Sequence, residues 1–250
     1  MPVIYDFGAN NGDDIPYYLK KADRVIAVDA NPVLTGHIAT RFQDEIKSGR
    51  LTVLNHVLSD ADGADPVPFY VHKHEHFRSQ FAPPPAAERS HFDEIAAIPR
   101  RPSAIIRHFG EPLYVKIDVE GHDHVVLKDL LLAGIRPDFI SAEAHHVDVF
   151  AWLAGPGGYN AFKLVDGPGV AVRYRDAVIR TDRGEERYSF PVHAAGPFGE
   201  DIAGPWMTAD QFFRVLAYAG LGWKDVHAAR DVTADPAYAP GVKVQLTPDF

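Results

Sequence analysis

Short apolar runs alternate with helix-length segments through the first 143 residues. We predict strands at 3–5, 24–29, 51–58, 113–119 and 138–143, with helices at 14–22, from 32 onward and at 122–133. Asn31 and Pro32 are typical of a helix cap followed by proline at the first helical position. Leu34, Ile38, Phe42 and Ile46 then recur every four residues and define one buried helix face. Strands separated by such helices favour right-handed crossovers and a doubly wound, mostly parallel α/β sheet.

The rest of the chain is less regular. Residues 67–71 suggest an edge strand, and the prolines at 83–85 suggest a surface loop. Residues 162–166 and 170–174 predict a hairpin around Gly167-Pro168-Gly169, and residues 176–205 read as loop. Thr208 and Gln211 form a capping box that begins a further helix. We interpret residues 1–250 as a single domain with an insertion or lid at about 176–222.

Aromatic and acidic residues in that insertion allow more than one interpretation. We expect Phe212 to lie in the core, whereas Trp206 suits either the core or stacking on a sugar ring. The acidic run Gly199-Glu200-Asp201 is expected to be solvated surface.

Composition narrows the class of protein. At 250 residues the chain suits one domain, and a net charge of -9 without a basic run argues against nucleic-acid binding. The absence of cysteine excludes disulfides, thiolate zinc sites and a cysteine nucleophile. No apolar run is long enough to span a membrane, and a strand beginning at Val3 leaves no room for a signal peptide. A cytoplasmic protein is the prediction.

The loop after the first strand carries Gly8, Asn10 and Gly12, where open parallel sheets bind ligands. A dinucleotide fingerprint, G-x-G-x-x-G, would need glycine at Asn10 and at Asp13. Asn10 would obstruct a pyrophosphate, and Asp13 would place a carboxylate beside it, so NAD and FAD are disfavoured. No P-loop sequence follows a strand either.

S-adenosylmethionine fits this loop better because it has no phosphate and carries a positive sulfonium. We expect Asp13 and Asp14 to face that cationic ligand. Asp29 ends the second predicted strand and suits the two ribose hydroxyls. The alternative for Asp29 is a simple cap on the next helix.

Three segments carry a family resemblance. DFGANNG, VIAVDANP and VKIDVEGHDHVVLKDL resemble the FkbM-type S-adenosylmethionine-dependent methyltransferases over roughly residues 3–165. The most specific segment is residues 116–122, after which Asp123 stands where the family has glutamate. The resemblance implies a class I methyltransferase (Rossmann-like) sheet of seven strands, the last antiparallel, and methylation of hydroxyl oxygens on sugars and other small molecules.

The resemblance also implies cofactor-binding residues. The methionine part of the cofactor would lie against Asp6, Gly8, Asn10 and Gly12. Asp29 would hold the ribose, Ala30 and Asn31 would border the adenosine, and residues 56–59 would flank the adenine. Asp118 would lie beside the methyl-transfer centre.

Methyl transfer to oxygen requires an aligned acceptor and a group that takes its proton. The ends of the fourth and fifth predicted strands offer candidates for this role: Asp118, His122, Glu143, His145 and His146. Glu120 would point the same way as Asp118, because strand side chains alternate. We predict that Glu143 or His145 positions or deprotonates the acceptor. We predict that Asp118 acts on the side of the site that holds the cofactor. The alternative is a structural role as the cap of the next helix.

The chain has 13 histidines, but their spacing matches no zinc signature, so we predict no metal. The expected partner is a small hydroxyl-bearing molecule such as a sugar, with no nucleic acid and no membrane. The alternative function is a non-catalytic module that binds S-adenosylmethionine without turnover.

Overall fold

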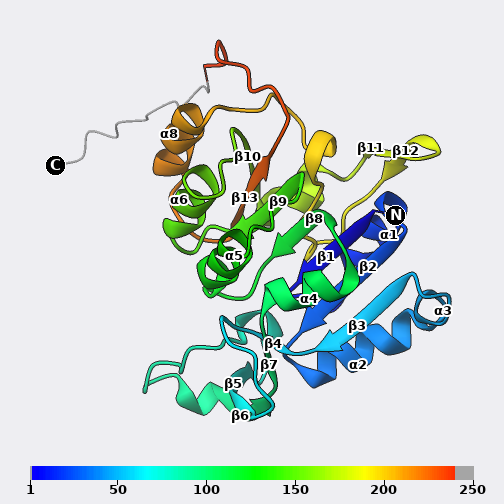
Figure 1. Cartoon of the computed structure of the whole chain (residues 1–250), viewed down its shortest axis with the longest axis vertical. Helices are drawn as coiled ribbons and strands as arrows, with labels where there is room; N and C mark the ends of the chain where they lie inside the picture. The colour runs from blue at the N-terminus through cyan, green and yellow to red at the C-terminus, as the bar shows by residue number, and fades with distance from the viewer. Residues whose placement is uncertain (1, 240–250) are drawn as a thin grey trace.

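The structure is a computed structural model that describes residues 2–239. A seven-stranded sheet forms the centre of the protein (Figure 1). The strands follow the spatial order β10-β13-β9-β8-β1-β2-β3. Their bounds are β1 (Val3–Phe7), β2 (Arg24–Asp29), β3 (Leu51–Asn55), β8 (Pro112–Ile117), β9 (Phe139–Glu143), β10 (Ala161–Asp166) and β13 (Lys224–Ala229). β13 is antiparallel to both of its neighbours, and the remaining pairs are parallel. The predicted doubly wound α/β sheet with one antiparallel strand is confirmed.

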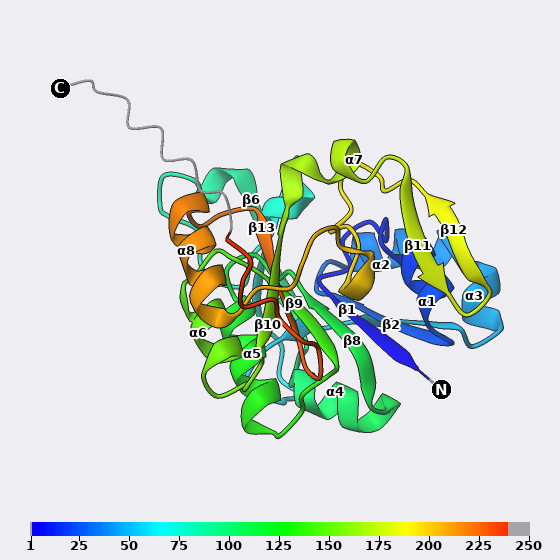
Figure 2. The same ribbon diagram turned by 90° about the horizontal axis from the view of Figure 1, so that it is seen from above.

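Helices cover both faces of the sheet (Figure 2). One face packs against α4 (Pro102–Phe109), α5 (Asp123–Leu132), α6 (Asp148–Ala154) and α8 (Ala209–Ala219). The other packs against α1 (Ile15–Lys21), α2 (Pro32–Arg41) and α3 (Gln43–Lys47). Because both faces are covered, every residue of β1 is buried, as in parallel sheets generally.

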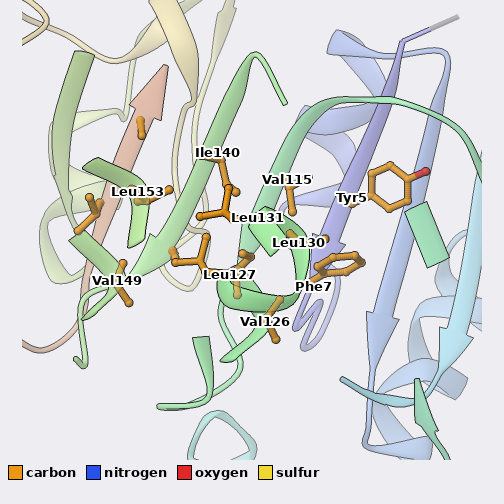
Figure 3. Close-up of a cluster of buried hydrophobic side chains, with 14 of the residues drawn as sticks. Tyr5, Phe7, Val115, Val126, Leu127, Leu130, Leu131, Ile140, Val149 and Leu153 are labelled. Atoms are coloured by element: carbon orange, nitrogen blue, oxygen red, sulfur yellow. The ribbon is translucent and has the colours of Figure 1, made fainter. Parts of the chain in front are cut away.

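The larger core lies between α5 and the sheet. Val126, Leu127, Leu130 and Leu131 of α5 pack with Tyr5, Phe7, Val115 and Ile140 of the strands (Figure 3). This packing holds the ends of β1, β8 and β9 in register, and the candidate site lies at those ends.

The structure confirms the first, second, fourth and fifth strands and the helices between them. Asn31 caps α2 as predicted, with its side chain accepting a hydrogen bond from Val33 N at 3.0 Å. The third strand is shorter than predicted, because β3 ends at Asn55. Beyond His56 the chain leaves the main sheet, and β4 (Val57–Leu58) pairs with β7 (Pro99–Arg100).

Residues 56–101 form a small subdomain beside the main sheet (Figure 1). Its other elements are β5 (Val67–His72), η1 (His76–Arg78), η2 (Arg89–His91) and β6 (Phe92–Ala97). The strand expected at 67–71 exists, but it pairs with β6 in a separate two-stranded sheet.

The predicted hairpin around Gly167 is wrong. β10 pairs with β13, more than fifty residues later, and η3 (Gly167–Gly169) leads into the short helix α7 (Val170–Arg173). Val170 is buried in the core beside α1, which a solvent-facing hairpin strand would not allow. The segment read as loop contains a hairpin of its own, β11 (Ala177–Thr181) and β12 (Gly184–Tyr188).

The acidic run at η4 (Gly199–Asp201) is solvated only in part: Glu200 is exposed as predicted, whereas Asp201 is not. Asp201 is buried, pairs with Lys21 at 2.8 Å and accepts a hydrogen bond from Tyr17 Oη at 2.8 Å. These bonds fasten the segment to α1.

α8 begins at the predicted capping box, and Phe212 is fully buried in the main core. Trp206 is buried too: its Nε1 donates to Glu200, and the Lys163 ammonium lies 4.5 Å from its ring centroid. Trp206 therefore packs in the core and lines no cavity described below.

That residues 176–222 act as a lid stays a prediction. Within residues 2–239, no helix is both long and apolar enough to cross a membrane.

Candidate active site

A cavity of about 380 Å³ opens at the carboxyl ends of the central strands. Its lining includes seven of the residues predicted from sequence: Gly8, Asn10, Asp29, Ala30, Asp118, Glu143 and His145. They follow β1, β2, β8 and β9, and the topology brings these strand ends to one edge. His56 and Leu58, from the segment expected to flank the adenine, also line the cavity.

Three predicted cofactor residues lie behind the cavity wall. Asp6 is fully buried within β1, and Asn31 caps α2. Gly12 has a φ of +79° and is surrounded by Ile15, Ile38 and Phe42. These residues shape the loop and do not line the cavity.

The loop after β1 passes unusually close to the end of β8. A Cβ at Gly8 would lie 1.7 Å from the Asp118 carbonyl oxygen, and the φ of Gly8 is +87°. Only glycine fits both restrictions. Asn10 follows in the left-handed region at φ +46°, where asparagine is tolerated.

Asp29 fastens this loop to the start of α2. Its Oδ2 accepts a hydrogen bond from Asn10 N at 2.9 Å, and its Oδ1 accepts one from Asn31 N at 2.8 Å. Burial raises the pKa of Asp29 to about 6. Each carboxylate oxygen keeps a further lone pair for a ligand hydroxyl. The side chain that caps α2 is that of Asn31, so capping alone does not account for Asp29.

Lys116 is the residue that sequence reasoning missed on the cofactor side. Its Nζ donates to Gly8 O at 2.9 Å and lies 3.2 Å from Asp118 Oδ2 and 3.6 Å from Asp6 Oδ1. Burial lowers the pKa of Lys116, but Asp118 and Asp6 outweigh burial and raise that pKa well above its usual range. The signal was a lysine in the middle of an otherwise apolar strand.

The expectation that Asp13 and Asp14 face the ligand is wrong. Asp13 pairs with Arg41 at 2.8 Å. Asp14 is buried and accepts a hydrogen bond from Ala195 N at 3.0 Å, which fastens the segment before η4 to the start of α1. Neither carboxylate is among the groups that line the cavity.

At the opposite end of the cavity, Glu143 Oε2 lies 3.2 Å from His145 Nδ1. Burial, and then the Asp118 carboxylate, raises the pKa of Glu143 well above its usual range. The same two causes raise the pKa of Glu120, which also lines the cavity. A positive ligand in this end of the cavity would favour the ionised carboxylates.

The two remaining histidine candidates lie in different places. His122 lines the cavity, whereas His146 stacks on His124 and pairs with Asp148 outside it.

The aromatic part of the cavity wall comes from residues that the sequence analysis did not assign to the site. Residues 56–101 supply Phe69, Phe77 and Phe81, and later segments supply His193 and Trp223. Only their aromatic character was visible in the sequence, because the fold of the subdomain decides which of them face inward.

A glycine-bearing loop after β1, a carboxylate ending β2 and an open cavity at the strand ends define a Rossmann-like α/β protein with a site for a nucleoside-type cofactor. The family model described as the methyltransferase FkbM domain matches residues 6–166, more than half of the chain. The chain therefore belongs to the FkbM methyltransferase family. No curated protein matches it.

Among solved structures, the chain is similar to the methyltransferase FkbM from Methylobacillus flagellatus KT. It is 16% identical with a TM-score of 0.43, over 65% of this chain and 39% of that one, so this chain spans well under half of its length. Precorrin 8w decarboxylase from Methanobacterium thermoautotrophicum is 10% identical with a TM-score of 0.42, over 92% and 82% of the two chains. Precorrin-6y C5,15-methyltransferase from Geobacter metallireducens GS-15 is 11% identical with a TM-score of 0.39, over 92% and 79%.

Proposed function

We propose that this protein is an S-adenosylmethionine-dependent O-methyltransferase that acts on a hydroxyl of a sugar or another small polar molecule. One observation carries the proposal: a single cavity extends from Asp29 at the end of β2 to the Glu143–His145 pair at the end of β9. A carboxylate suited to the ribose and a candidate proton acceptor therefore share one cavity in a chain of a methyltransferase family.

The residues around the loop fit this cofactor. When bound, S-adenosylmethionine would supply a methyl group on a positively charged sulfonium. Asp29 retains lone pairs for the two ribose hydroxyls, and Ala30 lines the adjoining wall. Asp118 places a carboxylate in the cavity wall, and a bound sulfonium would favour the ionised form of the neighbouring Glu120, so the site suits a sulfonium better than a pyrophosphate.

Glu143 and His145 would act on the acceptor. Their 3.2 Å contact allows one proton to be held between them, so the pair can accept a hydroxyl proton as a unit. His145 is about one third exposed, which leaves its ring accessible to an entering acceptor, whereas Glu143 is buried behind it.

The test is release of S-adenosylhomocysteine by the purified protein with a panel of sugars and small alcohols. We expect Glu143→Gln and His145→Ala to bind the cofactor normally and to lose about 10²- to 10⁴-fold in rate, the usual contribution of general base catalysis. His146→Ala is the matched control, because this neighbouring imidazole lies outside the cavity, and its rate should not change.

Wild-type rates in both Glu143→Gln and His145→Ala would place the base elsewhere. Cofactor binding without turnover on any acceptor would instead favour a non-catalytic binding module.

A further inference from the structure

We propose that Glu120, Glu143 and His145 form a binding site for one divalent metal ion at the acceptor end of the cavity. One oxygen of each carboxylate and one imidazole nitrogen lie within 4.8 Å of one another. The three residues come from the loop after β8 and from the end of β9, which are neighbours in the sheet (Figure 1).

The spacing of these atoms is close to that of ligands around one ion. Oxygen and nitrogen ligands bind such ions at about 2.0–2.2 Å, so two ligands of one ion are at most about 4.4 Å apart. Side-chain adjustments of a few tenths of an ångström would therefore complete the site. Glu120 is held in the left-handed region at φ +52°, a costly conformation that is common at functional sites.

A second observation points to a cation in this position. Glu143 is only 4% exposed, and its Oε2 makes no hydrogen bond: its near neighbour is His145 Nδ1 at 3.2 Å, itself one of the three proposed ligands. Buried carboxylate oxygens normally have a polar partner, and a metal ion is one of the partners that they take.

Nearby lysine and arginine side chains do not pair with the two glutamates. Within residues 2–239 no lysine or arginine forms an ion pair with Glu120 or Glu143. Lys116 is occupied by Asp118 and Asp6, and Arg78 in the cavity wall pairs with Glu75 and Glu88. The acceptor end is therefore an acidic pocket whose two glutamates form no ion pair with a lysine or arginine among the described residues.

The ligand set indicates which ions fit. Two carboxylates and one imidazole suit ions that accept both oxygen and nitrogen, such as Mn²⁺ and Zn²⁺, over Mg²⁺ and Ca²⁺, which prefer oxygen alone. Three protein ligands would leave coordination positions open, as in catalytic sites. If the proposed function holds, hydroxyl oxygens of the acceptor would occupy those positions, and in the ion-bound protein Glu143 and His145 would position the acceptor through the ion instead of taking its proton directly.

This inference departs from the expectation, drawn from sequence spacing, that no metal binds. No signature joins Glu120 to Glu143 and His145, because only the parallel pairing of β8 with β9 brings them together.

The experiment is titration of the chelator-treated full chain with Mn²⁺ alone, followed by electron paramagnetic resonance. We expect one saturable Mn²⁺ site, with affinity reduced tenfold or more in Glu120→Gln and in Glu143→Gln. Nitrogen hyperfine coupling to the bound Mn²⁺ should be present in the wild type and lost in His145→Ala. His146→Ala and Glu94→Gln, an exposed glutamate on β6, are matched controls and should bind Mn²⁺ like the wild type.

No saturable Mn²⁺ binding by the wild type would overturn the proposal, whatever the stability of the variants. Unchanged binding in correctly folded Glu120→Gln and His145→Ala would do the same. A parallel titration with S-adenosylmethionine separates the two proposals: cofactor binding and turnover without Mn²⁺ binding would refute the metal site and leave the proposed function intact, and the reverse pattern would refute the function alone.

Discussion

Single residues at this site hold separate segments of the chain together. Asp29 connects two backbone amides across the loop and faces the cavity, and Lys116 neutralises two carboxylates while it holds the Gly8 carbonyl. Asp29 was predictable because it ends an apolar run. The contacts of Lys116 were not, because they join β8 to a loop more than a hundred residues earlier.

Replacing Asp29 should weaken the cofactor without unfolding the chain. A hydrogen bond to a charged group contributes about 1.5–3 kcal/mol, and about 1.4 kcal/mol corresponds to tenfold in affinity. Asp29→Ala should therefore raise the calorimetric Kd for S-adenosylmethionine about tenfold or more. Asp44→Ala, an exposed aspartate on α3, should leave the Kd unchanged. An unchanged Kd in folded Asp29→Ala would rule out the ribose role.

The raised pKa of Asp29 predicts a pH dependence of binding. Burial raises this pKa to about 6 in the free protein, and ribose hydroxyls favour the ionised carboxylate. Below pH 6 Asp29 is protonated in the free protein and must lose that proton before the ribose binds. The affinity for S-adenosylmethionine should therefore fall as the pH drops through 6, by up to about tenfold per pH unit, and should level off above about pH 7. Titrations from pH 5 to 8 on wild type and Asp29→Ala isolate this component, since the other carboxyl groups that line the cavity are the same in both proteins. Parallel pH profiles for the two would contradict the assignment.

At the scale of elements, the sequence predicted structure wherever the deciding contacts are local. The Asn31 cap and the Thr208–Gln211 box join residues two or three positions apart, so both are visible in the sequence and both are present. The hairpin around Gly167 failed because the partner of β10 is the distant β13. The third strand was extended too far because nothing local shows that Val57 pairs with Pro99.

The capping box at the start of α8 should contribute measurably to stability. Thr208 Oγ1 accepts a hydrogen bond from Gln211 N at 3.3 Å, and Gln211 Oε1 accepts one from Thr208 N at 2.8 Å. Thr208→Ala should lower the free energy of unfolding by about 1 kcal/mol, measured by urea denaturation. Thr208→Ser keeps the hydroxyl and should stay close to the wild type. Equal losses in both variants would show that the hydroxyl does not cap the helix.

At the scale of the whole molecule, the site is assembled from the ends of four strands, the subdomain at 56–101 and the segment before β13. The strand-end residues Asp29, Asp118 and Glu143 could be predicted together, because parallel strands end at one edge of a sheet. The aromatic wall and the Glu120–Glu143–His145 cluster could not, because they depend on how loops fold across that edge.

The central claim is that this cavity takes S-adenosylmethionine and excludes dinucleotides. The most direct test is a calorimetric titration of the wild-type chain with S-adenosylmethionine and, separately, with NAD. The account predicts saturable one-to-one binding of S-adenosylmethionine and no measurable binding of NAD. Saturable NAD binding with none for S-adenosylmethionine would contradict it.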